Sequence, residues 1–138
     1  ELGGEPFVLE ESARPAYHAA LTHGANHLVT LVGQAVRVLA AAGVDDGGQV
    51  LRPLLTAALE RALSEGADAA LTGPVARGDA GTVRVHLDTL AGLDDGTGAG
   101  LDDVVESYRV LARATLERRV GRLGPEQAAA LREVLGDC

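Results

Sequence analysis

The most regular pattern in the chain is a row of apolar residues, three and four positions apart, between about Ala16 and Ala42. This row consists of Leu21, Ala25, Leu28, Val32, Ala35 and Leu39. Such spacing is typical of one face of an α-helix, and Pro15 and Gly43 suit its two ends. A second row on another side of the same helix contains Val29, Val36 and Ala40. We therefore expect a long central helix that several neighbours contact, with a second subunit as one candidate.

The same spacing predicts two helices in the middle of the chain. One covers about Val50 to Glu65, with Pro53 near its first turn and Gly66 at its end. Its expected buried face comprises Leu51, Leu55, Ala58 and Ala62. A connecting loop, "ADAALTGPVARGD", follows it. Asp79 is then expected to cap a helix that runs through Val83 and Leu87 to Leu90.

Two more helices are predicted in the last third of the chain. One should present a single face of Leu101, Val104, Val105, Tyr108, Leu111, Ala112 and Thr115. The other is short, starts at Gly124-Pro125 and carries Leu131 and Leu135. By composition, the stretch before them, "AGLDDGTGAGLDD", is the most flexible. The pattern predicts an all-α fold, a bundle of about five helices around the long first helix.

The opening segment, "ELGGEPFVLEESARP", does not fit this bundle. Phe7, Val8 and Leu9 form one short strand-like run, and the sequence offers no second strand to pair with it. We expect residues 1–14 to be a linker, or the last strand of a preceding domain, and residues 15–138 to be the helical domain. The absence of an initial Met agrees with the expectation of a longer protein.

Composition narrows the possible functions. The net charge is −8 and all 12 basic residues are arginine, so lysine Schiff-base chemistry and a lysine general acid are excluded. An acidic chain without a basic stripe argues against nucleic acid as a partner. No apolar run approaches a membrane span and no signal peptide is visible. The single cysteine, Cys138, cannot form an internal disulfide, which suits a reducing cytoplasm.

Three of the four histidines lie in one short stretch, "YHAALTHGANHL". His23 and His27 are four positions apart and share a helical face, the spacing of two zinc ligands. A zinc site needs a third and usually a fourth ligand, and Gly24 stands where metalloproteases of the H-E-x-x-H type have glutamate. We therefore assign no metal site and regard the pair as polar residues facing solvent or a partner, with zinc binding as the alternative.

A second set on this helix is better placed for chemistry. His18, Thr22 and Asn26 follow one another at four-residue steps, so they form one strip that could bind a carbonyl or carboxylate group. A histidine there can accept or supply a proton near neutral pH. The alternative is that His18 and Asn26 are buried and satisfy neighbouring backbone groups.

The loop "LTGPVARGD" is the other concentration of polar groups. Thr72 offers a hydroxyl, Gly73 permits an unusual backbone path, and Arg77 can hold an anion through two parallel hydrogen bonds. Asp79 can hold that arginine or cap the next helix. The alternative is an ordinary connector between helices. "GTGAGL", by contrast, lacks the third glycine and the preceding strand of a dinucleotide-binding loop.

Three segments in combination, "RPAYHAALTHGANHLVTL", "ALTGPVARGD" and "YRVLARATLE", resemble the C-terminal helical domain of Rossmann-like oxidoreductases of the DUF2520 family. This family is related to ketopantoate reductase and to the C-terminal fold of 6-phosphogluconate dehydrogenase. The likeness runs from "GGEPFVLEES" to about Glu117.

The resemblance implies a substrate-binding and dimerisation domain that follows a Rossmann domain, which would bind NAD or NADP. It implies His18 and Asn26 as catalytic residues, with Tyr17, Thr22, Thr72, Gly73, Arg77 and Asp79 binding a small anionic oxo acid. The lysine that ketopantoate reductase-like enzymes place first in the strip is here His18, which leaves the ketopantoate reaction itself open. The fragment alone is expected to be inactive. The rival interpretation is a helical dimerisation or interaction module without chemistry.

Overall fold

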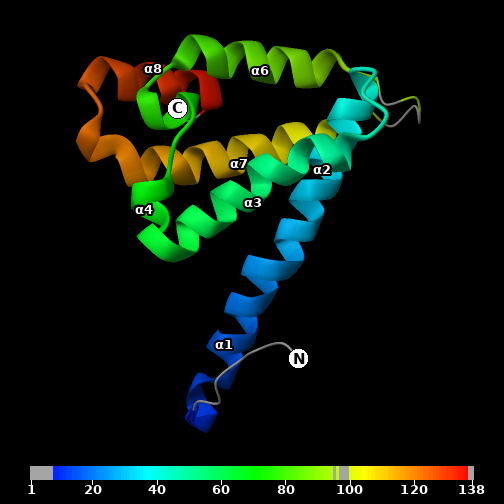
Figure 1. Ribbon diagram of the computed structural model, residues 1–138. Coiled ribbons are helices and arrows are strands. Elements are labelled where there is room, and N and C mark those ends of the chain that lie inside the picture. Colours follow the sequence, from blue (N-terminus) through cyan, green and yellow to red (C-terminus); the bar gives the residue numbers. More distant parts are fainter. Residues whose placement is uncertain (1–7, 95, 97–99, 137–138) are drawn as a thin grey trace. The chain divides into compact units, whose positions relative to one another are not determined.

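The computed structural model describes residues 8–94, 96 and 100–136, and every regular element in these residues is a helix. The longer helices are α1 (Arg14–Leu21), α2 (His27–Ala41), α3 (Gly47–Glu65), α6 (Ala80–Gly92), α7 (Asp102–Arg119) and α8 (Pro125–Leu135) (Figure 1). The shorter ones are η1 (Glu11–Ala13), the π-helix η2 (Thr22–Asn26), α4 (Ala67–Ala70), α5 (Pro74–Arg77) and η3 (Val120–Arg122). The predicted all-α class is confirmed for these residues.

The chain divides into two compact units, Glu1–Gln34 and Ala35–Cys138, so that the division falls inside α2. The strand-like run is only partly described: Val8 and Leu9 have no regular structure, and Phe7 lies outside the described residues. Residues 95 and 97–99 of the glycine-rich stretch between α6 and α7 are also outside them. No described helix is long and apolar enough to cross a membrane.

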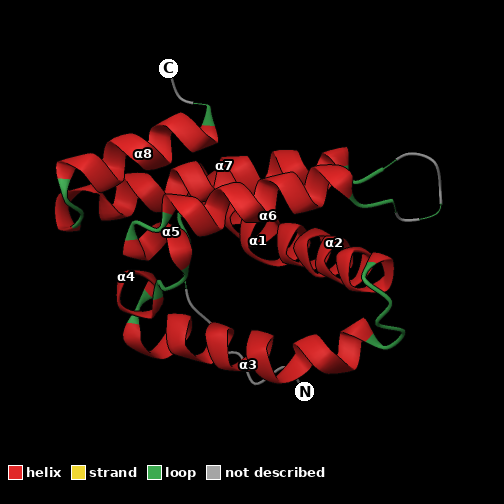
Figure 2. Cartoon of the chain, turned by 90° about the horizontal axis from the view of Figure 1, so that it is seen from above, coloured by secondary structure: helices red, strands yellow, loops and turns green. Residues whose placement is uncertain are grey.

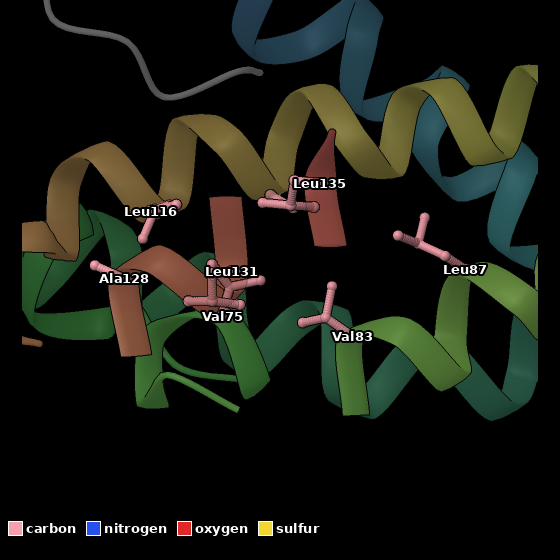
Figure 3. Packing of buried hydrophobic residues seen from close by; sticks show 8 residues of the cluster. Val75, Val83, Leu87, Leu116, Ala128, Leu131 and Leu135 are labelled. Carbon is pink, nitrogen blue, oxygen red and sulfur yellow. The ribbon is translucent and has the colours of Figure 1, made fainter. Parts of the chain in front are cut away.

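The hydrophobic core lies in the second unit, where α6, α7 and α8 pack together and the short α5 contacts α6 and α7 (Figure 2). Its buried members are Val75, Val83, Leu87, Ala112, Leu116, Ala128, Leu131 and Leu135 (Figure 3). Leu131 and Leu135 have no exposed surface, as expected of the fifth predicted helix. Leu111 is 44% exposed, because α7 turns Ala112 and Leu116 inward in its place.

Helix α3 begins three residues before the predicted Val50. The carboxylate of Asp46 accepts a hydrogen bond from the backbone N–H of Gln49 at 3.2 Å, so the cap lies between the ends that the spacing predicts for the two helices. A β-carbon at Gly47 would lie 3.3 Å from the Cβ of Leu39, so a larger residue there would require a small shift of the Leu39 side chain. As a result, Pro53 lies inside the helix and not near its first turn.

Burial differs from the prediction along both long helices. In α3 only Gly47 is fully buried. Leu51, Leu55 and Ala62 of the predicted buried face are half-buried, whereas Ala58 is exposed and Leu63, outside that face, is 75% exposed. In the first unit every side chain between Arg14 and Leu31 is exposed, including much of the predicted seam. The core of the described chain is therefore formed by α5–α8, and not around the first helix.

Candidate functional site

The residues predicted to act on a substrate fall into two groups, one in each compact unit. The first unit holds Tyr17, His18, Thr22 and Asn26, and the second holds Thr72, Gly73, Arg77 and Asp79.

The first group lies where the long helix changes its winding. The predicted helix from Ala16 to Ala42 is present as α1, η2 and α2 in succession, but the residues Thr22–Asn26 form a π-helix. There the backbone N–H of His27 donates to the carbonyl of Thr22, five residues earlier. π-helical segments are rare in proteins, and a large share of those that exist lie at functional sites.

The π-helix affects how the polar strip is aligned. An α-helix has 3.6 residues per turn, so residues four positions apart are separated by slightly more than one full turn. A row of such residues therefore shifts steadily around the helix axis. A π turn holds more residues, and the step from Thr22 to Asn26 therefore falls short of a full turn. The drift between His18 and Thr22 is then reversed, and we infer that His18 and Asn26 stay on the same side.

His18, Thr22 and Asn26 are all exposed. Within the described chain neither His18 nor Asn26 is buried, so the packing of this chain does not use them to satisfy buried backbone groups. The His18 ring lies beside that of Tyr17, with centroids 6.0 Å apart and a tilt of 49°. The strip thus presents an imidazole, a hydroxyl and a carboxamide to solvent, a set that can hydrogen-bond to a carbonyl or carboxylate.

His23 and His27 form a second arrangement on the same segment. Their Nδ1 atoms are 3.1 Å apart, and the rings meet edge to face with centroids 5.2 Å apart. Both side chains are exposed. Among the described residues, no three His, Cys, Asp or Glu side chains gather in a way that could hold a metal ion.

The second group lies around α5, where the predicted loop contains the two short helices α4 and α5. Gly73 (φ 99°) precedes Pro74 and Gly78 (φ 78°) ends α5, so left-handed backbone bounds this helix on both sides. The segment that leads into α5 is held by Arg119, whose guanidinium donates a hydrogen bond to the carbonyl of Leu71 at 2.5 Å. Thr72 and Arg77 are exposed beside this fixed backbone.

Asp79 is the N-cap of α6, as predicted. Its carboxylate accepts hydrogen bonds from the backbone N–H of Thr82 at 2.9 Å and from the Thr82 hydroxyl at 2.6 Å. These hydrogen bonds lower the pKa of Asp79 most, and the positive charges of Arg77 and His86 lower it further. The main role of Asp79 is therefore to cap α6. Its negative charge also interacts with the positive charge of Arg77.

Replacing Asp79 with alanine is expected to lower the urea midpoint of the chain, since the first turn of α6 loses its acceptor. The folded-state pKa lies below the ordinary value of 3.8, so the contribution is present above that value and lost as the pH falls through the lowered pKa. The difference between wild type and variant should therefore shrink on acidification. Asp88→Ala, an exposed change in the same helix, is the control. A difference that does not depend on pH would contradict the assignment.

One further pair of polar side chains was not predicted from the spacing. Nδ1 of His86 in α6 lies 2.9 Å from the hydroxyl of Tyr108 in α7, and the two rings are nearly perpendicular. Burial raises the pKa of Tyr108, which favours the protonated phenol as a hydrogen-bond donor. The pattern placed Tyr108 on an apolar face and His86 on a separate helix, and only the packing of α6 on α7 brings them together.

An open hollow of about 480 Å³ lies elsewhere in the second unit, where α4 approaches the end of α7. It is lined by Glu65, Gly66, Ala67, Asp68, Ala69, Arg118 and Arg122. Arg118 is paired with Asp68 at 3.2 Å, so part of its charge is already neutralised. None of the residues predicted to bind substrate lines this hollow.

Comparison with protein families matches residues 1–115 to the family described as "Domain of unknown function (DUF2520)". No curated protein and no solved structure matches the chain.

Proposed function

Because the chain belongs to the DUF2520 family, we propose that it is the C-terminal domain of an NAD(P)-dependent oxidoreductase that acts on a small oxo or hydroxy acid. The observation that carries the proposal is the exposed strip of His18, Thr22 and Asn26 on a π-helical segment. It lies within the part of the chain that matches the family. An imidazole in line with a carboxamide is suited to protonate and orient a carbonyl group that receives hydride.

The residues have separate roles in this proposal. His18 is the general acid or base, and Asn26 orients the substrate by hydrogen bonding, with Tyr17 and Thr22 beside them. Thr72, Gly73 and Arg77 help to hold the anionic group, for which an exposed arginine next to fixed backbone is suitable, and Asp79 contributes to this substrate site through its charge near Arg77. The nicotinamide cofactor is held mainly by a Rossmann domain that precedes residues 1–14, and this chain alone is inactive.

The proposal includes a homodimer formed through the helical domain, with an arrangement like that of the 6-phosphogluconate dehydrogenase C-terminal fold. Large apolar side chains on α1, α2 and α3 support it: Leu21 is 51% exposed, Val29 72% and Leu54 68%. Exposed apolar surface of this kind often marks an interaction site. The single cysteine is compatible with a reducing cytoplasm as the place of action.

Nicotinamide binding tests the proposal directly. We expect the reading frame before Glu1 to encode a strand followed by G-x-G-x-x-G, and the longer protein to bind NADPH or NADH in a fluorescence titration. The 138-residue chain should not bind either cofactor, and it serves as the control. Absence of binding by the longer protein would contradict the proposal.

A helical dimerisation or interaction module without chemistry is the second candidate. The exposed apolar residues of α3, above all Leu54 and Leu63, favour it because they have no evident role in catalysis. Light scattering that shows a strict monomer at all concentrations would count against both the module and the dimer of the first proposal. Turnover that depends on His18 would count against the module alone.

A further inference from the structure

The pair formed by His23 and His27 has no part in the function proposed above. The two residues come from the start of the π-helix η2 and the first position of α2. Their side chains are exposed, and the Nδ1 atoms face each other at 3.1 Å. Two imidazole nitrogens this close are suited either to share a hydrogen or to bind one common ion.

The distance matches a chelate. Imidazole nitrogens lie about 2.0–2.1 Å from zinc, so two of them 3.1 Å apart subtend roughly 98° at a shared ion. That angle lies between the right angle of octahedral or tetragonal coordination and the tetrahedral angle. The separation of the two nitrogens therefore already suits two neighbouring ligands, and both exposed rings need to rotate so that their Nδ1 lone pairs point at the shared ion.

We propose that His23 and His27 form a two-ligand site for a borderline divalent transition-metal ion, such as Zn²⁺, Ni²⁺ or Cu²⁺. Imidazole suits these ions, whereas Mg²⁺ and Ca²⁺ prefer oxygen ligands. Because no third protein ligand gathers there among the described residues, the remaining positions are open to water or to an oxygen of another molecule. The site is thus an exchangeable one and differs from a closed structural zinc site.

Binding requires little proton movement. In the metal-free pair one Nδ1 carries the hydrogen and the other accepts it. To bind an ion at both Nδ1 atoms, the donor ring moves its hydrogen to Nε2, which leaves both rings neutral. Both side chains are exposed, so water can mediate this exchange.

The affinity of the full 138-residue chain for Ni²⁺ and Zn²⁺, measured by calorimetry at neutral pH, tests the site. We expect one ion per chain, and a loss of affinity of at least about tenfold in both His23→Ala and His27→Ala. His18→Ala is the matched control, because it removes an exposed imidazole from the same unit but leaves the pair intact. This variant should bind within about twofold of wild type. Circular dichroism of each variant shows whether the helix is preserved.

A second measurement does not depend on variants. Cu²⁺ added to the wild-type chain should broaden the imidazole NMR signals of His23 and His27 before those of His18 and His86. Equal affinity of all three variants, half an ion per chain, or broadening that favours His18 or His86 would overturn the proposal. None of these outcomes bears on nicotinamide binding, so the site and the oxidoreductase proposal can fail independently.

Discussion

Replacing Leu116 with alanine is expected to lower the free energy of unfolding of this chain by about 3 kcal/mol. Leu116 has no exposed surface and belongs to the core formed by α5–α8 (Figure 3). The shorter side chain loses the transfer free energy of the removed atoms and leaves a cavity that the surrounding helices cannot fully close. Urea denaturation followed by circular dichroism measures the loss.

Leu111→Ala in the same helix is the matched control. The residue type, the substitution and the helix are identical, but the Leu111 side chain is 44% exposed. We expect a loss below about 1 kcal/mol, because water already covers much of this side chain. Similar losses at the two positions would mean that the core is not organised around α7 as described.

The contrast between Leu116 and Leu111 also shows how far periodicity predicts this fold. The sequence indicated the existence and approximate bounds of α6, α7 and α8, because their apolar residues repeat at helical spacing. It did not distinguish Leu111 from Ala112 as the inward residue, since both lie on a broad apolar stripe. That choice depends on where α6 and α8 pack, which a repeat within one helix does not specify.

Burial of α3 shows the same limit. Spacing predicted a buried face from Leu51 to Ala62. Periodicity indicates which residues share a face of a helix, but not how deeply that face is buried. Whether that face is covered depends on a neighbour. In the described chain Leu51, Leu55 and Ala62 are half-buried and Ala58 is exposed, so spacing identified the right face of α3 but not that it is only partly covered.

The site was predictable to different degrees. The capping role of Asp79 follows from its position before an apolar helix, and it is confirmed by the two hydrogen bonds from Thr82. The π-helix has no comparable signal, because the residues Thr22–Asn26 continue the helical spacing of their neighbours. The pairing of His86 with Tyr108 joins residues 22 positions apart, and only the packing of two helices brings them together.

Replacing His18 with alanine in the longer, cofactor-binding protein is expected to reduce kcat by about 10²–10⁴-fold, the usual contribution of a general acid or base. The expected reaction is oxidation of NADPH or NADH by a panel of small 2-oxo acids, followed by absorbance. KM should change less, because Asn26 and the exposed Arg77 remain to bind the substrate. Stability should change little, since the side chain of His18 is exposed and supports no core packing.

Glu11→Ala is the control for this experiment. Glu11 is an exposed residue of the same unit that forms an ion pair with Arg14 at 3.0 Å, and its loss should leave turnover unchanged. His18→Gln separates two roles, because glutamine can still donate a hydrogen bond but cannot transfer a proton near neutral pH. If His18→Gln and His18→Ala are equally impaired, proton transfer is the lost function. If both retain full turnover, His18 has no catalytic role, and the strip on the π-helix must be explained as an interaction surface.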